Sequence, residues 1–117
     1  QALSDAELLL DRKSIRGAAN RIYYAAFHAV SAVALSRERV FAKHQGLISF
    51  FHAECVQTGQ FEIKHGRALQ KAFEDRAEAD YEDDLSLDES TLNQRLHEVR
   101  LLVDAIKSFV AETSGGR

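Results

Sequence analysis

The sequence predicts an all-α protein: an antiparallel four-helix up-and-down bundle with a short additional N-terminal helix. Its 117 residues contain no Pro and only six Gly, so few positions would interrupt a helix. Apolar residues recur at the three- and four-residue spacing of a helix, and no segment shows the alternation of a strand. Because short polar connections separate these segments, we expect consecutive helices to run antiparallel.

Polar residues mark the starts of the first two helices. Ser4 and Glu7 have the spacing of a capping box, which predicts a short helix that continues through Leu10. Ser14 can cap a second helix that runs to about Arg37. The apolar residues at helical spacing in this second segment are Ile15, Ala18, Ala19, Ile22, Ala26, Ala29, Val30 and Val33.

Three more helices are expected after it. The third is expected over about 44–58, where Gly59 provides a stop. The fourth is expected over about 63–80. A second possible capping box, Ser86 with Glu89, begins a last helix that runs to about residue 110.

The chain is expected to form one domain. Residues 1–113 would make the bundle and 114–117 a frayed tail. The formal net charge of −3 argues against tight nucleic-acid binding by bulk charge. Charge is nevertheless uneven, since 12–43 holds seven basic residues and one acid, whereas 74–84 holds seven acids and one base. Either these are solvated helix faces, or a basic surface for RNA or an acidic partner adjoins an acidic surface for a basic partner.

Composition also bears on compartment and cofactors. Cys55 is the single cysteine, so no disulfide can form within the chain, which fits a reducing cytoplasm. We expect it to be a small buried hydrophobe. The apolar runs are too short to span a membrane, and there is no signal-peptide pattern. His44, His52 and His65 lack zinc-site spacing, and no phosphate-binding loop motif is present, so we expect neither a metal nor a cofactor.

An unusual polar stripe lies on the second predicted helix. Arg21 and His28 are 700° apart at 100° per residue, close to two full turns, and so share a face. Tyr24 falls between them, and Asn20 lies one turn before Tyr24. Tyr23 and Phe27 form a neighbouring aromatic pair at i, i+4.

Two interpretations of this stripe are open. In the structural one, Arg21 pairs with an acid such as Asp75 or Asp80, and His28 is a satisfied, half-buried histidine. In the functional one, His28 exchanges a proton with the ribose 2′-OH or the leaving oxygen of RNA, and Arg21 binds the phosphate. That chemistry needs no metal, and Asn20 and Tyr24 would position the RNA.

Two other groups of residues could belong to such a site. Lys43 and His44 could contact a phosphate, although His44 could equally be an ordinary residue at a helix start. Arg76 and Asp80 have i, i+4 ion-pair spacing, and Tyr81 follows them directly. These three could form a structural clasp at the end of the fourth helix. Alternatively they could extend the polar cleft, with Asp80 orienting Arg21 or His28.

Five segments, in order, are similar to the small stand-alone prokaryotic proteins of the HEPN family. NRIYYAAFHAV (20–30) resembles the signature helix of that family, and KHQGLISFFH (43–52) resembles its second conserved helix. TGQF (58–61) resembles the turn after that helix, and RAEADY (76–81) resembles an Arg-x-x-x-Asp-Tyr signature. The last amphipathic helix fits as well, so the resemblance covers almost the whole chain.

The resemblance implies a bundle of four or five antiparallel helices, commonly a homodimer. It also implies a minimal nucleotidyltransferase as partner in a two-gene toxin–antitoxin system, in which the HEPN protein is often an RNase. The motif of those RNases is an Arg and a His separated by four to six residues, and Arg21 and His28 are separated by six. Family members often carry a polar residue directly after the Arg, where this chain has Ile22.

Three functions therefore remain open from the sequence. The first is a metal-independent endoribonuclease of toxin type, with Arg21 and His28 as catalytic residues. The second is a non-catalytic subunit that holds a nucleotide or other substrate for a separate nucleotidyltransferase. The third is a dimerising structural module without chemistry.

Overall fold

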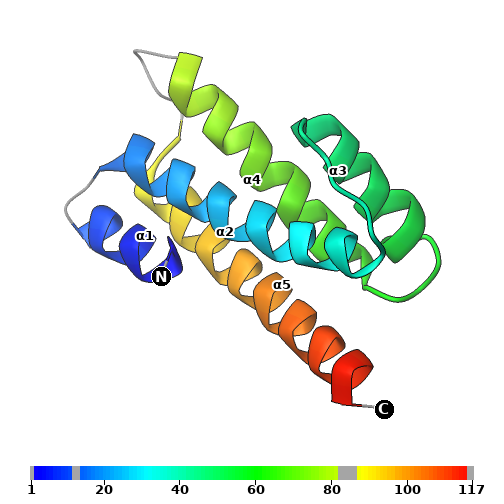
Figure 1. Cartoon of the computed structure of the whole chain (residues 1–117). Coiled ribbons are helices and arrows are strands. Elements are labelled where there is room, and N and C mark those ends of the chain that lie inside the picture. The colour runs from blue at the N-terminus through cyan, green and yellow to red at the C-terminus, as the bar shows by residue number, and fades with distance from the viewer. Residues whose placement is uncertain (1, 12–13, 82–86, 116–117) are drawn as a thin grey trace.

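The computed structural model describes residues 2–11, 14–81 and 87–115, and it is all-α over these ranges (Figure 1). The predicted all-α class is confirmed. The elements are α1 (Ala2–Asp11), α2 (Ile15–Ser36), α3 (His44–Phe50), the π-helix η1 (Phe51–Val56), α4 (Ile63–Tyr81) and α5 (Glu89–Gly115).

Helix α2 is the central element. It packs against α1, α4 and α5, and the last two also pack against each other. Figure 1 shows α1, α2, α4 and α5 lengthwise beside one another in alternating directions. The short first helix is part of this arrangement because Ala6 and Leu10 are buried. The unit of α3 and η1 lies at the side, against α2 and α4.

Small side chains allow the other helices to approach α2 closely. Ala18, Ala19 and Ala26 are at most 1% exposed, and Val30 is fully buried beside them. Because alanine adds little beyond the backbone, neighbouring helices can lie near the α2 axis. The same helix keeps its larger polar side chains on the opposite face, where the candidate site lies.

A buried ion pair joins α4 to α5. The Nε atom of Arg95 donates a hydrogen bond to the Asp75 carboxylate at 2.5 Å, and both side chains are 11% exposed. Its Nη1 atom lies 2.8 Å from Glu98. Neither charge could be buried here without its partner.

A π-helix replaces the end of the third helix, which was predicted as continuous α-helix over 44–58. The backbone N–H of Gln57 donates to the carbonyl of His52, five residues earlier, at 2.9 Å. Phe50 and Phe51 are both buried, and so are Cys55 and Val56, five positions later. The wider π turn keeps both pairs on the core side, which the α-helical repeat of 3.6 residues would not do.

The starts of two helices differ from prediction. Helix α1 begins at Ala2, so Ser4 lies inside it and does not cap it. At the start of α5 the backbone N–H of Thr91 donates to the Asp88 carboxylate at 2.7 Å. Asp88 therefore caps α5, and this hydrogen bond lowers the pKa of its carboxyl group. The predicted cap Ser86 lies outside the described residues.

Other local expectations were mostly met. The chain turns at Gly59, whose φ of 85° is one that glycine adopts without strain. Cys55 is fully buried, as predicted. Helix α5 runs to Gly115, beyond the expected end near residue 110. Over the described ranges, no helix combines the length and apolar character needed to cross a membrane.

Candidate functional site

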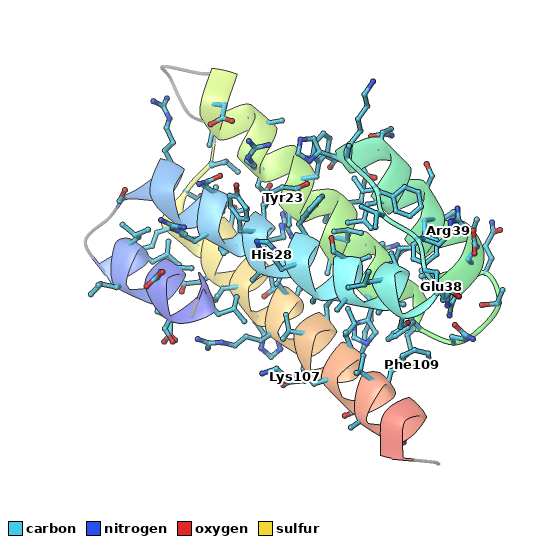
Figure 2. The ribbon with its side chains drawn as sticks, viewed as in Figure 1. Tyr23, His28, Glu38, Arg39, Lys107 and Phe109 are labelled. Carbon is cyan, nitrogen blue, oxygen red and sulfur yellow. The ribbon has the colours of Figure 1, made fainter. Side chains whose placement is uncertain are left out.

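The predicted catalytic pair, Arg21 and His28, lies on a solvent-exposed face of α2. Arg21, Tyr24 and His28 are all exposed, Tyr24 by 42%. The Tyr24 and His28 rings stack with centroids 5.3 Å apart and an interplanar angle of 21°. Figure 2 shows His28 on this helix, with Tyr23 nearby. The shared face predicted from the helical repeat is therefore present.

The structural interpretation of Arg21 and His28 was wrong. Both acids proposed as partners of Arg21 are engaged elsewhere, since Asp75 pairs with Arg95 and Asp80 lies 4.0 Å from Arg76. Among the described residues Arg21 has no ion pair or hydrogen bond. His28 is exposed rather than half-buried. The guanidinium and the imidazole are thus accessible to a ligand.

Arg76 ties the end of α4 to α2. Its Nε atom donates to Asn20 Oδ1 at 3.2 Å, and its guanidinium lies 5.3 Å from the centre of the Tyr23 ring. It also lies at ion-pair distance from Asp80. The clasp interpretation of this segment is supported for Arg76 and Asp80, and Asp80 orients neither Arg21 nor His28. The Tyr81 side chain lies outside the described residues.

His44 belongs to an aromatic cluster formed by Tyr23, Phe27, His44 and Phe73. The Tyr23 hydroxyl hydrogen-bonds with His44 Nδ1. The His44 ring centre lies 5.3 Å from that of Phe73, 5.4 Å from that of Tyr23 and 6.0 Å from that of Phe27. Burial raises the pKa of Tyr23 to about 12, which keeps its hydroxyl protonated. His44 thus opens α3 and anchors it to α2, while Lys43 beside it is exposed.

A groove of about 670 Å³ adjoins His28. It lies between α2 and α5, with α1 at one edge, and it is mostly apolar. Its two polar side chains are His28 and Lys107, which Figure 2 labels on α2 and α5. Its apolar lining includes Ala25, Ala29, Ala32, Val103, Ile106 and Val110.

These groups define the available chemistry. The exposed pair of a guanidinium and an imidazole can bind an oxyanion and move a proton. Over the described ranges, no three His, Cys, Asp or Glu side chains come together as metal ligands could. The groove was missed from the sequence, although the three alanines at helical spacing on α2 were a signal of a small-residue face.

The comparison with protein families decides the classification. The HEPN domain family matches residues 1–109. The chain belongs to the HEPN domain family. This confirms the resemblance seen in the α2 motif and the segments after it.

Relatives of this HEPN protein cover nearly all of it. A Thermotoga maritima protein named "UPF0332 protein" is 33% identical over 96% of this chain and 85% of its own length. A Methanocaldococcus jannaschii protein named "Putative toxin MJ0605" is 34% identical over 94% of this chain and 81% of its own. A second protein of that organism, "Putative toxin MJ0142", is 24% identical over 94% of this chain and 75% of its own.

Proposed function

We propose that this HEPN protein is a metal-independent endoribonuclease of toxin type that acts on RNA in the cytoplasm. The observation that carries the proposal is the exposure of Arg21 and His28 on one face of α2 without an ion pair to either among the described residues. A structural role would have buried and paired them. The toxin names of two relatives support the same class of function.

The proposed reaction uses the ribose of the substrate as nucleophile. The neutral imidazole of His28 takes the proton of the 2′-OH as this oxygen attacks the adjacent phosphorus. The 2′-oxygen–phosphorus bond forms as the bond from phosphorus to the 5′-oxygen of the next nucleotide breaks, which gives a 2′,3′-cyclic phosphate. The protonated imidazole of His28 then returns the proton to the leaving 5′-oxygen, directly or through water. Arg21 donates to the phosphate oxygens, where negative charge accumulates in the transition state. The Tyr24 ring offers a surface on which a base can stack.

The spacing of the pair favours a site shared between two copies of the chain. Seven residues at 1.5 Å per residue place Arg21 and His28 about 10 Å apart along the axis. A general base must lie within about 3 Å of the group from which it takes a proton. The apolar groove beside His28 is a surface that a second copy could cover. In the proposed homodimer, the α2 faces of both subunits flank one cleft.

The other predicted contacts take different places in this proposal. Exposed Lys43 is available to an RNA phosphate, whereas His44 is committed to the aromatic cluster and supports the position of α3. Asn20 accepts a hydrogen bond from Arg76, so this pair ties α2 to α4 and the Asn20 amide oxygen is already engaged.

The test is cleavage of a mixed RNA pool in EDTA by purified wild type, Arg21→Ala and His28→Ala. His97→Ala is a matched control, because His97 is an exposed histidine on α5 outside the groove. We expect cleavage by the wild type and the control only. Cleavage by folded His28→Ala at the wild-type rate would refute the assignment.

The dimer has its own test. Ala32→Glu places a charge in the groove without replacing a buried side chain, since Ala32 is exposed. We expect the variant to sediment as a monomer, with native helicity, and to lose cleavage. Cleavage by that monomer at the wild-type rate would show that one chain suffices.

The groove also favours a second candidate: a subunit that holds a nucleotide or other substrate for a partner nucleotidyltransferase. Its volume of about 670 Å³ and its largely apolar lining with two polar groups are typical of ligand pockets. This candidate predicts no cleavage by any folded variant, together with a complex with the nucleotidyltransferase that Ala32→Glu weakens.

A further inference from the structure

A second, cationic cavity lies on a different face of the bundle. It has a volume of about 220 Å³ and lies where α4 meets α5. None of its lining residues comes from α2, so it is separate from the Arg21 and His28 face. Its lining residues are Lys64, His65, Arg67 and Lys71 of α4 with Glu98 and Leu101 of α5.

The charges in this cavity are unbalanced. Lys64, Arg67 and Lys71 are three cations along one side of α4. The single acid, Glu98, is occupied by a hydrogen bond from Arg95 at 2.8 Å and another from Gln94 at 3.1 Å. Lys64 has only the exposed carboxylate of Glu62 at 3.7 Å. Among the described residues, neither Arg67 nor Lys71 lies within 4.0 Å of an acid, although the charge of Lys71 is one of the causes that lower the Glu98 pKa.

Their position on the helix makes the imbalance more costly. Helix α4 begins at Ile63, so Lys64 lies in its first turn and Arg67 directly after that turn. The N-terminal end of a helix carries partial positive charge and favours acids. The first turn of α4 contains none, and the acid that directly precedes it is the exposed Glu62. An anion bound in the cavity would be attracted by the side chains and by the helix end together.

His65 gives an independent sign of a missing partner. Its side chain is 6% exposed, and its Nδ1 atom has no hydrogen-bond partner among the described residues. Buried polar atoms are nearly always hydrogen-bonded in native proteins. Burial, followed by the charge of Lys64, lowers the His65 pKa, while the carboxylate of Glu62, 3.9 Å from Nε2, opposes the shift. An anion bound near His65 would favour the protonated imidazole.

Arg67 connects this cavity to a larger one. The neighbouring cavity, about 490 Å³, lies between α4 and the α3–η1 unit. Its rim includes Gln45, Ser49, His52 and Gln70, and Phe51 and Val56 of η1 also line it. Single π turns are frequent at functional sites. A ligand with its anionic group in the cationic cavity would therefore have room for an organic body beside it.

We propose that the cationic cavity binds the phosphate group of a phosphate ester whose organic part occupies the neighbouring cavity. The fork of Arg67 bridges the two parts, and Lys64 and Lys71 neutralise the remaining charge. The ester can come from a nucleotide within an RNA strand or from a free phosphorylated small molecule. The site does not depend on the proposed nuclease, because it shares no residue with that face.

Calorimetric titration tests the site with three probes: inorganic phosphate, ribose 5-phosphate and a short single-stranded RNA that ends in a 5′-phosphate. The variants are Arg67→Ala and Lys71→Ala. Arg39→Ala is the matched control, since it removes one exposed arginine from the loop between α2 and α3 (Figure 2). We expect about tenfold weaker phosphate and ribose 5-phosphate binding in the two cavity variants, and no change in the control.

The RNA probe distinguishes the two sources. If the strand is the source, Arg67→Ala weakens RNA binding as much as it weakens ribose 5-phosphate binding. If a free small molecule is the source, Arg67→Ala weakens ribose 5-phosphate binding and leaves RNA binding unchanged. An NMR titration of His65 gives a second readout, because bound phosphate should raise its pKa in the wild type and not in Arg67→Ala. Equal losses in Arg39→Ala and Arg67→Ala, or no saturable binding of any probe, would overturn the proposal.

Discussion

Replacing Arg95 by methionine should destabilise the protein strongly, because it leaves the Asp75 carboxylate buried without its partner. Both side chains are 11% exposed, and their hydrogen bond is 2.5 Å long. Removing one member of such a pair typically costs about 3–5 kcal/mol. That is a large part of the roughly 5–15 kcal/mol by which native domains are stable.

The pH dependence of this loss depends on Asp75 and Glu98. Burial raises the pKa of Asp75 even though Arg95 opposes the rise, so folding already disfavours its ionised form. Without Arg95 the pKa should rise further. The resulting loss of stability grows as pH rises from the unfolded carboxyl pKa to the raised folded pKa, and it is complete above the latter. Although burial alone would raise the Glu98 pKa, hydrogen bonds from Arg95 and Gln94 lower it on balance. Its stabilising contribution is therefore present above the unfolded carboxyl pKa and is lost as pH falls.

Arg95→Met leaves the Asp75 carboxylate unpaired and removes the hydrogen bond to Glu98, and both losses of stability should become smaller at acidic pH. We expect the loss in the free energy of unfolding, measured by urea denaturation, to be largest at neutral pH and much smaller below about pH 4, the ordinary carboxyl pKa. Arg100→Met is the control, because Arg100 pairs with Glu7 at an exposed position, where a pair contributes about 0–1 kcal/mol. Asp75→Leu with Arg95→Met should recover most of the stability. A loss that is equal at both pH values, or that persists in the double variant, would refute this reasoning.

Three further predictions concern single residues. Tyr23→Phe should cost about 1 kcal/mol in urea denaturation, because it removes the hydroxyl bonded to His44; in the wild type, an absorbance titration should show one of the three tyrosines ionising near 12. Gly59→Ala should lower the free energy of unfolding by about 1 kcal/mol, because Gly59 has a φ of 85° that alanine adopts only with strain. Glu38→Gly should raise the free energy of unfolding, because Glu38 has a φ of 59°. Equal changes in the two variants would contradict the left-handed backbone at these positions. The Cys55 thiol, which is buried and whose pKa burial raises, should react with a disulfide reagent only after unfolding, and fast labelling of the native protein would be evidence against the packing.

Periodicity and composition predicted the helices well because each helix buries one face of a regular repeat. The expected segments after Gly59 and before Arg37 match α4 and α2 closely. Local capping was predicted less well. Ser4 lies inside α1, and Asp88, which was not predicted as a cap, caps α5. Only the path of the chain decides which side chain reaches an unpaired backbone N–H. The sequence did contain a signal of the π-helix: the apolar pairs Phe50–Phe51 and Cys55–Val56 begin five residues apart, and both pairs are buried.

The site was predictable only in part. The shared face of Arg21 and His28 could be derived from the 100° step of the helix, but their exposure depends on where Asp75 and Asp80 find partners. The partner of Asp75 is Arg95, 20 residues away on another helix, whereas the partner of Asp80 is Arg76, one turn earlier on the same helix. The groove beside His28 and the cavity around Arg67 are likewise spaces between helices, which no single segment encodes.

The π-helix has a consequence for how this chain can change in length. His52 and Ala53 are exposed, and their side chains meet few packing demands. Deleting one of them would leave the two buried pairs four residues apart, a spacing that an ordinary α-helical turn keeps on one face. The π turn would then relax to α-helix with Cys55 and Val56 still on the core side. In evolution this stretch should therefore tolerate the loss of one residue better than a regular turn of a core helix would.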